Sequence, residues 1–286
     1  MAFKDLLLQI SSYPEASPES VIAQGVEFAA ALQAEITALA FEYTMDVPYS
    51  PMDGMFLNVA GMVAAETQKS LVNAKAALKS FQTMALERGV MHGQIIERCS
   101  SRMLPDAVTD HARLRDLTLI PARGMGDFQQ SVAEKVIFES GRPVVILPEP
   151  PATATVKPRS LSLERVGIAW DFSRPAARAV ADAMPILIQA EVVRVVIVSN
   201  EKTIATRRSL ADLERHLGLH GIDVAVDDEN DAGRSIGETL AQYADAFTLD
   251  LLVMGAYGHS RFRDFLLGGA TQSMTASPAL PIFLSH

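Results

Sequence analysis

The chain has 286 residues, a formal net charge of −9 and a single cysteine. The acidic balance argues against a surface that coats nucleic acid, and one cysteine permits neither an internal disulfide nor a cysteine-only metal cage. No run approaches the roughly 20 apolar residues of a membrane span, and the N-terminus shows no cleavage-site pattern. We therefore expect a cytoplasmic protein.

Length and composition predict two domains, residues 1–150 and 161–286. Apolar residues make up 49% of the chain, enough for a buried core in each domain. The segment 149–160 is rich in Pro, Thr and Ala and has no periodicity, so it is interpreted as the linker.

Short apolar runs alternate with helical patterns along the first half. The predicted strands are 4–11, 36–41, 94–97, 117–120 and 143–147. The predicted helices are 18–33, with Ser17 as its cap, 56–88, 104–113 and 130–139. Strands that alternate with helices indicate a parallel sheet covered on both faces.

The second half repeats this order. Its predicted strands are 165–170, 192–198, 223–226, 251–254 and 281–284. Its predicted helices are 175–189, interrupted or bent at Pro185, then 203–217, 235–247 and one that follows Gly269. The fold class is therefore α/β, with two tandem doubly wound domains, each with a five-stranded, mainly parallel sheet flanked by helices.

A cluster of glycines follows the buried strand 251–254. Gly255 and Gly258 come directly after it, and Gly268 and Gly269 stand just before a predicted helix. Glycine lets the backbone approach a ligand closely, and the start of a helix offers free N–H groups. The arrangement predicts a cradle for phosphate.

The spacing Gly255-x2-Gly258-x9-Gly268 resembles the nucleotide-binding signature of universal stress proteins. Gly269 stands where that family has Ser or Thr, so one hydroxyl expected on a phosphate is missing. The chain resembles the tandem members, closely over residues 160 to 286 and more loosely over 1 to 150. The resemblance implies an adenine nucleotide such as ATP or AMP as ligand, with Mg²⁺ as a candidate companion.

The resemblance also implies which residues form the site. Asp171 and the backbone of Val198 are expected to contact the adenosine, and the cradle N–H groups the phosphates. The residues of the expected site are Ala169, Trp170, Asp171, Val198, Met254, Gly255, Gly258, His259, Arg261, Gly268, Gly269, Ala270 and Thr271.

Each of these side chains also has a plainer structural interpretation. Asp171 can be a loop acid beside Ser173, which would cap the next helix. Val198 and Trp170 can be ordinary core residues. His259 and Arg261 suit phosphate by charge and hydrogen bonding, but they also suit a solvated loop. Thr271 can replace the lost hydroxyl or cap a helix.

The first half lacks the matching residues. Pro121 stands where Gly255 stands, Gln130 replaces Gly268, and no acid near Ser11 matches Asp171. We expect the first half to keep the fold without the cradle, so that each chain has at most one nucleotide site.

Two further patterns are interpreted as structural. Ser235, between Gly233 and Gly237, matches the nucleophile elbow of serine hydrolases, but a serine at a helix start explains it better. His216 and His220 have a spacing that can hold a metal, yet they stand near a predicted helix end. No catalytic residue and no metal ligand is therefore assigned.

These observations favour a stress-response regulatory protein that binds an adenine nucleotide in its C-terminal domain, with slow hydrolysis or none. The alternatives are a ligand-free interaction scaffold of the same fold and a weak hydrolase. The resemblance also implies pairing through the final strand of each half, 143–147 and 281–284. Such pairing within one chain makes an intramolecular pseudo-dimer, with a further homodimer left open.

Overall fold

The computed structural model describes residues 2–44, 59–122, 127–149, 161–198, 204–230, 233–256 and 278–286. Most of the expected linker and the expected cradle from Gly258 to Thr271, with the helix after Gly269, lie outside these ranges. The helix expected over 56–88 is described from Val59 onward.

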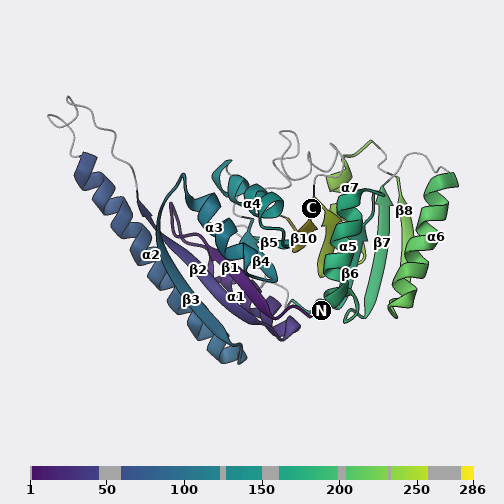
Figure 1. Cartoon of the computed structure of the whole chain (residues 1–286), viewed down its shortest axis with the longest axis horizontal. Coiled ribbons are helices and arrows are strands. Elements are labelled where there is room, and N and C mark those ends of the chain that lie inside the picture. Colours follow the sequence, from purple (N-terminus) through teal and green to yellow (C-terminus); the bar gives the residue numbers. More distant parts are fainter. Residues whose placement is uncertain are drawn as a thin grey trace.

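The first half alternates strands and helices as expected (Figure 1). Its strands are β1 (Asp5–Ile10), β2 (Glu35–Thr44), β3 (His92–Ser100), β4 (Leu117–Pro121) and β5 (Val144–Leu147). Its helices are α1 (Glu19–Leu32), α2 (Val59–Arg88), α3 (Leu104–Arg113) and α4 (Asp127–Glu139).

The second half repeats the alternation. Its strands are β6 (Arg165–Ala169), β7 (Val192–Val198), β8 (Val224–Glu229), β9 (Leu251–Gly255) and β10 (Ile282–Ser285). Its described helices are α5 (Arg174–Leu187), α6 (Ile204–Leu219) and α7 (Ile236–Ala246).

The ten strands in the described ranges form one continuous sheet, in the order β3-β2-β1-β4-β5-β10-β9-β6-β7-β8. Each half contributes five parallel strands in the same doubly wound order, and the halves meet where β10 runs antiparallel to β5. Ile282 lies opposite Ile146, and Leu284 lies opposite Val144. The expected pairing of the two final strands within one chain is confirmed, and it covers two edges that would otherwise be open.

The core has two layers, one on each face of the sheet, and each layer runs through both halves. Helices α1, α2, α5 and α6 cover one face, and α3, α4 and α7 cover the other. Phe3 of the first half packs against Phe283 of β10, with ring centroids 6.3 Å apart. The halves therefore share their buried apolar surface.

One aspartate precedes β4 and another precedes β9, and the two have matching roles. Asp116 accepts hydrogen bonds from the backbone N–H groups of Lys4 and Asp5 at the start of β1, at 2.8 and 3.1 Å. Asp250, which is buried, accepts from the N–H groups of Glu164 and Arg165 at the start of β6. This equivalence aligns Pro121 with Gly255.

Two local expectations differ from the structure. Helix α5 continues through Pro185, so the interruption expected there is absent, while the alternative of a bend stays a prediction. A proline in the last turn removes a single N–H group near the helix end. Ser17 does not cap α1, whose N-cap is Pro18 without a side-chain bond. The Ser17 hydroxyl instead accepts a hydrogen bond from the N–H of Ser11, which closes the loop between β1 and α1.

Within the described ranges, no helix has both the length and the apolar character needed to cross a membrane.

Candidate functional site

The carboxyl ends of β9, β6 and β7 lie side by side in the second half. Ala169 at the end of β6 is in register with Met254 of β9 on one side and with Val196 of β7 on the other. The chain leaves β6 for β7 on one side and returns on the other side as β9. In open α/β sheets, ligands bind beyond the strand ends at such a switch point.

Two of the expected site residues are buried in the core. Ala169 is 3% exposed and Met254 is 1% exposed, and both pack on the sheet face covered by α7. Contacts from these two residues to a ligand would have to come from their backbone.

Trp170 packs on the opposite face of the sheet, the face covered by α5 and α6. The backbone N–H of Trp170 donates to the carbonyl of Val196 at 2.9 Å, which extends the pairing of β6 with β7. Its ring meets Phe172 edge to face, with centroids 6.0 Å apart. The indole Nε1 is buried without a hydrogen-bond partner among the described residues. The ring position fits the interpretation of Trp170 as a core residue.

Asp171 begins the loop that leads from β6 into α5. Its Oδ1 accepts a hydrogen bond from the N–H of Ser173 at 3.0 Å, and the Ser173 hydroxyl accepts from the N–H of Ala176 at 3.2 Å. Phe172 between them has a left-handed φ of 62°. The predicted capping by Ser173 is confirmed, and the carboxylate of Asp171 lies at the start of α5, beyond the end of β6.

Gly255, the last residue of β9, packs directly against the first turn of α5. A Cβ on this residue would lie 2.4 Å from the backbone nitrogen of Ala176 and 2.5 Å from the carbonyl carbon of Pro175. Only glycine permits this approach of a strand end to a helix N-terminus. The partial positive charge of that terminus therefore lies at the switch point.

Val198 ends β7 and is in register with Glu229 of β8. Its side chain is half-buried and packs on the sheet face covered by α7. The structure thus brings Asp171, Val198 and Gly255 to the carboxyl ends of neighbouring strands. Seven further expected residues lie outside the described ranges: Gly258, His259, Arg261, Gly268, Gly269, Ala270 and Thr271.

Helix α7 is held over β7 and β8 by a polar network. Arg194 of β7 donates to both carboxylate oxygens of Asp227 and, at 2.9 Å, to the hydroxyl of Tyr243. Tyr243 donates in turn to Asp227, and the Arg194 guanidinium lies 3.7 Å from the ring centroid of Phe247. Burial, and to a smaller extent the hydrogen bond to Asp227, raises the pKa of Tyr243. The network fixes the C-terminal part of α7 over β7 and β8.

The equivalent position in the first half holds a buried glutamine pair. Gln129 of α4 donates from Nε2 to Oε1 of Gln9 at 2.7 Å, and its own Oε1 accepts from the hydroxyl of Ser11 at 3.5 Å. Gln9 is fully buried and Gln129 is 8% exposed. Neither glutamine was among the expected site residues, although a polar residue at the last inward position of a buried strand is a signal that the sequence contains.

The loop before the first helix differs between the halves. Residues 11–18 connect β1 to α1, whereas only residues 170–173 connect β6 to α5. The first half therefore has the longer connection at this end of the sheet, where Pro121 stands in place of Gly255.

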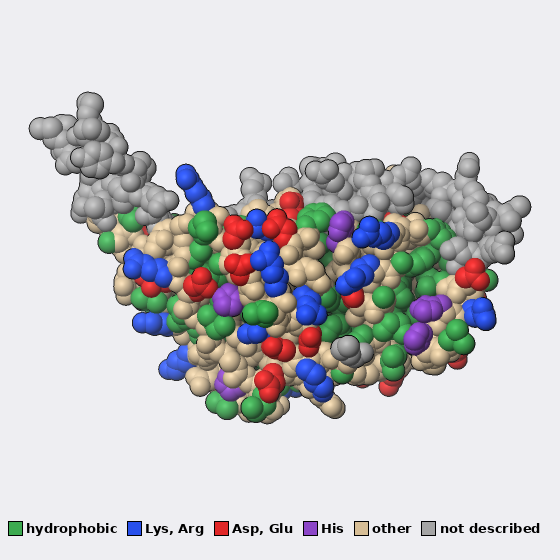
Figure 2. Space-filling model, in the orientation of Figure 1, with side chains coloured by type: hydrophobic (Ala, Val, Ile, Leu, Met, Phe, Trp, Pro, Cys, Tyr) green, Lys and Arg blue, Asp and Glu red, His purple; other side chains and the backbone are tan. Residues whose placement is uncertain are grey.

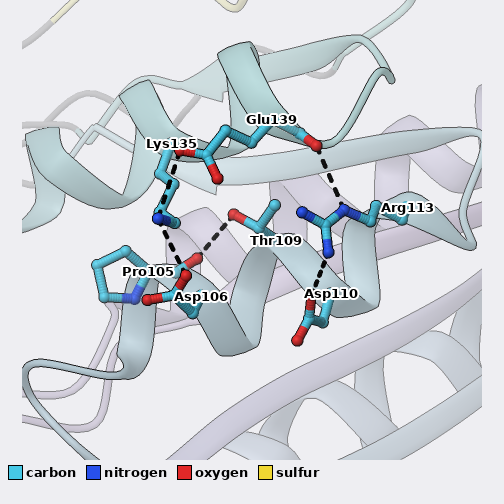
Figure 3. Close-up of polar contacts among 7 residues, drawn as sticks. All are labelled: Pro105, Asp106, Thr109, Asp110, Arg113, Lys135 and Glu139. Atoms are coloured by element: carbon cyan, nitrogen blue, oxygen red, sulfur yellow. Dashed lines mark hydrogen bonds and ion pairs between the residues drawn. The ribbon is translucent and has the colours of Figure 1, made fainter.

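One ion pair and one hydrogen bond join α3 to α4, the helix that carries Gln129. Lys135 of α4 lies 3.0 Å from Asp106 of α3, and Arg113 donates to the carbonyl of Glu139 (Figure 3). Charges of both signs are mixed over this part of the surface (Figure 2). Such contacts are partly exposed, and each contributes little to stability.

The remaining candidates have structural roles. Ser235 is the N-cap of α7, and it forms a reciprocal capping box with Glu238, as the preferred interpretation predicts. His216 and His220 are exposed at the end of α6, with ring centroids 5.1 Å apart. Among the described residues, no three potential metal ligands gather in one place. Cys99 is buried in β3, and burial raises the pKa of its thiol.

Neither a protein-family model nor a curated protein matches the chain. In structure, the chain is similar to a universal stress protein from Archaeoglobus fulgidus, with a TM-score of 0.67 and 18% identity over 98% of this chain and 95% of that one. It is also similar to a putative universal stress protein from Pseudomonas aeruginosa, with a TM-score of 0.54 and 10% identity over 99% and 93%.

A functionally unknown protein from Pseudomonas aeruginosa is similar at a TM-score of 0.53 and 10% identity, over 99% of this chain and 92% of that one. All three similarities extend through both halves. The chain therefore has the universal stress protein fold, with two such units in tandem.

Proposed function

We propose that the second half binds an adenine nucleotide and that the protein acts as a nucleotide-responsive regulator in a stress response. The observation that carries the proposal is that Asp171 and Gly255 both lie beside the start of α5, at the switch point of the second half. There the start of α5 lies against the end of β9. A helix N-terminus beside a carboxylate suits a ligand with a phosphate tail and ribose hydroxyls.

In this proposal, residues on the two sides of the switch point contact different parts of the nucleotide. Asp171 and the backbone of Val198 hold the adenosine. The backbone from Gly255 to Thr271 holds the phosphates, with His259 and Arg261 adding positive charge and Mg²⁺ bound only together with the nucleotide. No residue is assigned as a general base, so hydrolysis is expected to be slow or absent.

The asymmetry of the halves supports a single site per chain. In the first half, Gln129 and Gln9 form a hydrogen bond at the end of β1, the strand that corresponds to β6. Pro121, whose carbonyl accepts a hydrogen bond from Gln129, stands where the second half has Gly255. We propose that 1–150 is the degenerate domain and that 161–286 is the nucleotide-binding domain.

Isothermal titration of the full chain with ATP and with AMP tests the proposal. Micromolar binding is expected, and the fluorescence of Trp170, the only tryptophan, should respond because it neighbours Asp171. Absence of binding up to millimolar nucleotide would instead support the alternative of a ligand-free scaffold.

Three variants locate the site. Asp171→Asn keeps a side-chain oxygen for the Ser173 N–H but loses the charge that accepts from ribose, so affinity should fall while the fold is kept. Gly268→Val should weaken binding at least tenfold, about 1.4 kcal/mol, because a branched side chain would occupy the phosphate space. Pro121→Gly is the matched control in the first half and should leave affinity unchanged.

A further inference from the structure

Helix α2 has one buried side and one side that faces away from the molecule. It packs on β2 and α1, and it lies at the outer margin of the first half (Figure 1). The buried side comprises Ser70, Ala74, Ala77, Leu78, Phe81 and Ala85. The outward side is covered by no described element.

A line of regularly spaced residues runs along this outward side. All eight members are exposed, and we call them the α2 stripe: Met62, Ala65, Lys69, Val72, Ala76, Lys79, Thr83 and Leu86. The spacing alternates between three and four residues, which is the spacing of a coiled-coil seam. At about 1.5 Å per residue the stripe is about 36 Å long. A helix of a partner can therefore lie along its whole length.

Three large apolar side chains of the stripe are exposed to solvent. Met62 is 63% exposed, Val72 is 54% exposed and Leu86 is 64% exposed. They lie on one line with Ala65, Ala76 and Thr83 at coiled-coil spacing, so a partner helix with an apolar seam can contact each of them in turn. Val72 stands near the middle of the line.

The stripe is also positively charged, although the whole chain has a net charge of −9. Lys69 is 52% exposed, and its partner is Glu66 at 4.0 Å on the same helix. Within the described ranges Lys79 makes no ion pair, and neither does the adjacent Lys75. Lys and Arg side chains recur along the margin formed by α2 and β3 (Figure 2).

These lysines argue against a second copy of the chain as the occupant. If two α2 helices packed antiparallel about the middle of the stripe, Lys69 of one copy would face Lys79 of the other. If they packed parallel in register, each lysine would face itself. Both arrangements place like charges together, which disfavours association.

We propose that the α2 stripe docks an amphipathic helix of a partner protein that places acidic residues opposite Lys69 and Lys79. The two lysines lie about 15 Å apart along the axis, so the partner needs two acidic positions at that separation between apolar positions. Apolar contacts to Val72, Met62 and Leu86 supply affinity, and the charges supply selectivity. This surface lies in the first half and does not depend on the proposed nucleotide site.

A pair of designed peptides tests the proposal. Each is an amphipathic helix of about 25 residues with a leucine seam, and the two differ only in having Glu or Lys opposite Lys69 and Lys79. Fluorescence anisotropy with the full chain should show at least tenfold tighter binding of the Glu peptide. Val72→Gln should weaken that binding at least tenfold, whereas Leu219→Gln, at a 75% exposed position on α6, should leave it unchanged.

Charge reversal distinguishes the proposed contact from nonspecific binding. In the double variant Lys69→Glu/Lys79→Glu, the preference should switch to the Lys peptide, with an unchanged circular dichroism spectrum. Equal binding of both peptides, or no saturable binding, would overturn the proposal. So would a wild-type dimer in sedimentation that Val72→Gln dissociates, because the occupant would then be a second copy.

Discussion

Gly255 at the end of β9 lies so close to Ala176 in the first turn of α5 that a Cβ on residue 255 would be 2.4 Å from the Ala176 backbone nitrogen. The clash is with backbone, which cannot move aside as a flexible side chain can. The glycine is therefore required by packing, whatever it does for a ligand.

Gly255→Ala should destabilise the protein by about 1–3 kcal/mol, the usual effect of overpacking. Gly218 in α6 is the matched control, because a Cβ there meets nothing within 4 Å. Gly218→Ala should be neutral or stabilising by up to about 1 kcal/mol. Urea unfolding measures both, and equal stability of the two variants would contradict the close approach.

The buried glutamine pair of the first half should respond differently to single and double substitution. Gln129→Ala leaves the amide of Gln9 buried without its partner and should lower stability by about 1–3 kcal/mol. The double variant Gln9→Leu/Gln129→Leu should lose less, because it also removes the Gln9 Nε2 donor, which is buried without a partner among the described residues. Gln130→Ala serves as control, since Gln130 bonds to Glu134 on its own helix.

The two halves should unfold together, because both core layers and the sheet run through the junction. Phe283→Ala in β10 should lower stability by about 3–5 kcal/mol and shift the unfolding of both halves equally. Phe138→Ala, at a 44% exposed position, is the control and should have a much smaller effect. Trp170 fluorescence reports the second half, and hydrogen exchange of β1 and β2 peptides reports the first. Separate transitions would mean that the halves fold independently.

Ser235 should matter for stability and not for hydrolysis. Ser235→Ala removes the N-cap of α7 and should lower stability by about 1 kcal/mol. Loss of an esterase activity in this variant would support the hydrolase alternative.

The same contact predicts a pH dependence. Hydrogen bonds from the Ser235 N–H and hydroxyl lower the pKa of Glu238 below its ordinary 4.5. A carboxylate with a depressed folded pKa stabilises the native state above its unfolded pKa, and this contribution disappears as pH falls through the folded pKa. The stability difference between wild type and Ser235→Ala should therefore shrink below about pH 4.5.

The amino-acid sequence by itself determined the order of elements, the repeat and the strand that joins the halves. Alternating apolar runs and helical patterns are local signals, and each strand that was expected is present. Boundaries were less certain: β3 extends over His92–Ser100 where 94–97 was expected, since pairing with β2 along its whole length decides where a strand ends.

Only the tertiary structure decided which residues meet. The sequence contains Gly255 as a possible phosphate contact, but its approach to Ala176 depends on the short loop that places α5 on the strand end. Gln9 and Gln129 are 120 residues apart, and their pairing follows from β1 lying beside β4 with α4 above. The spacing of the α2 stripe is visible in the sequence, but its exposure is not. Periodicity shows which residues share one side of a helix, and only the tertiary structure shows which side packs against the sheet.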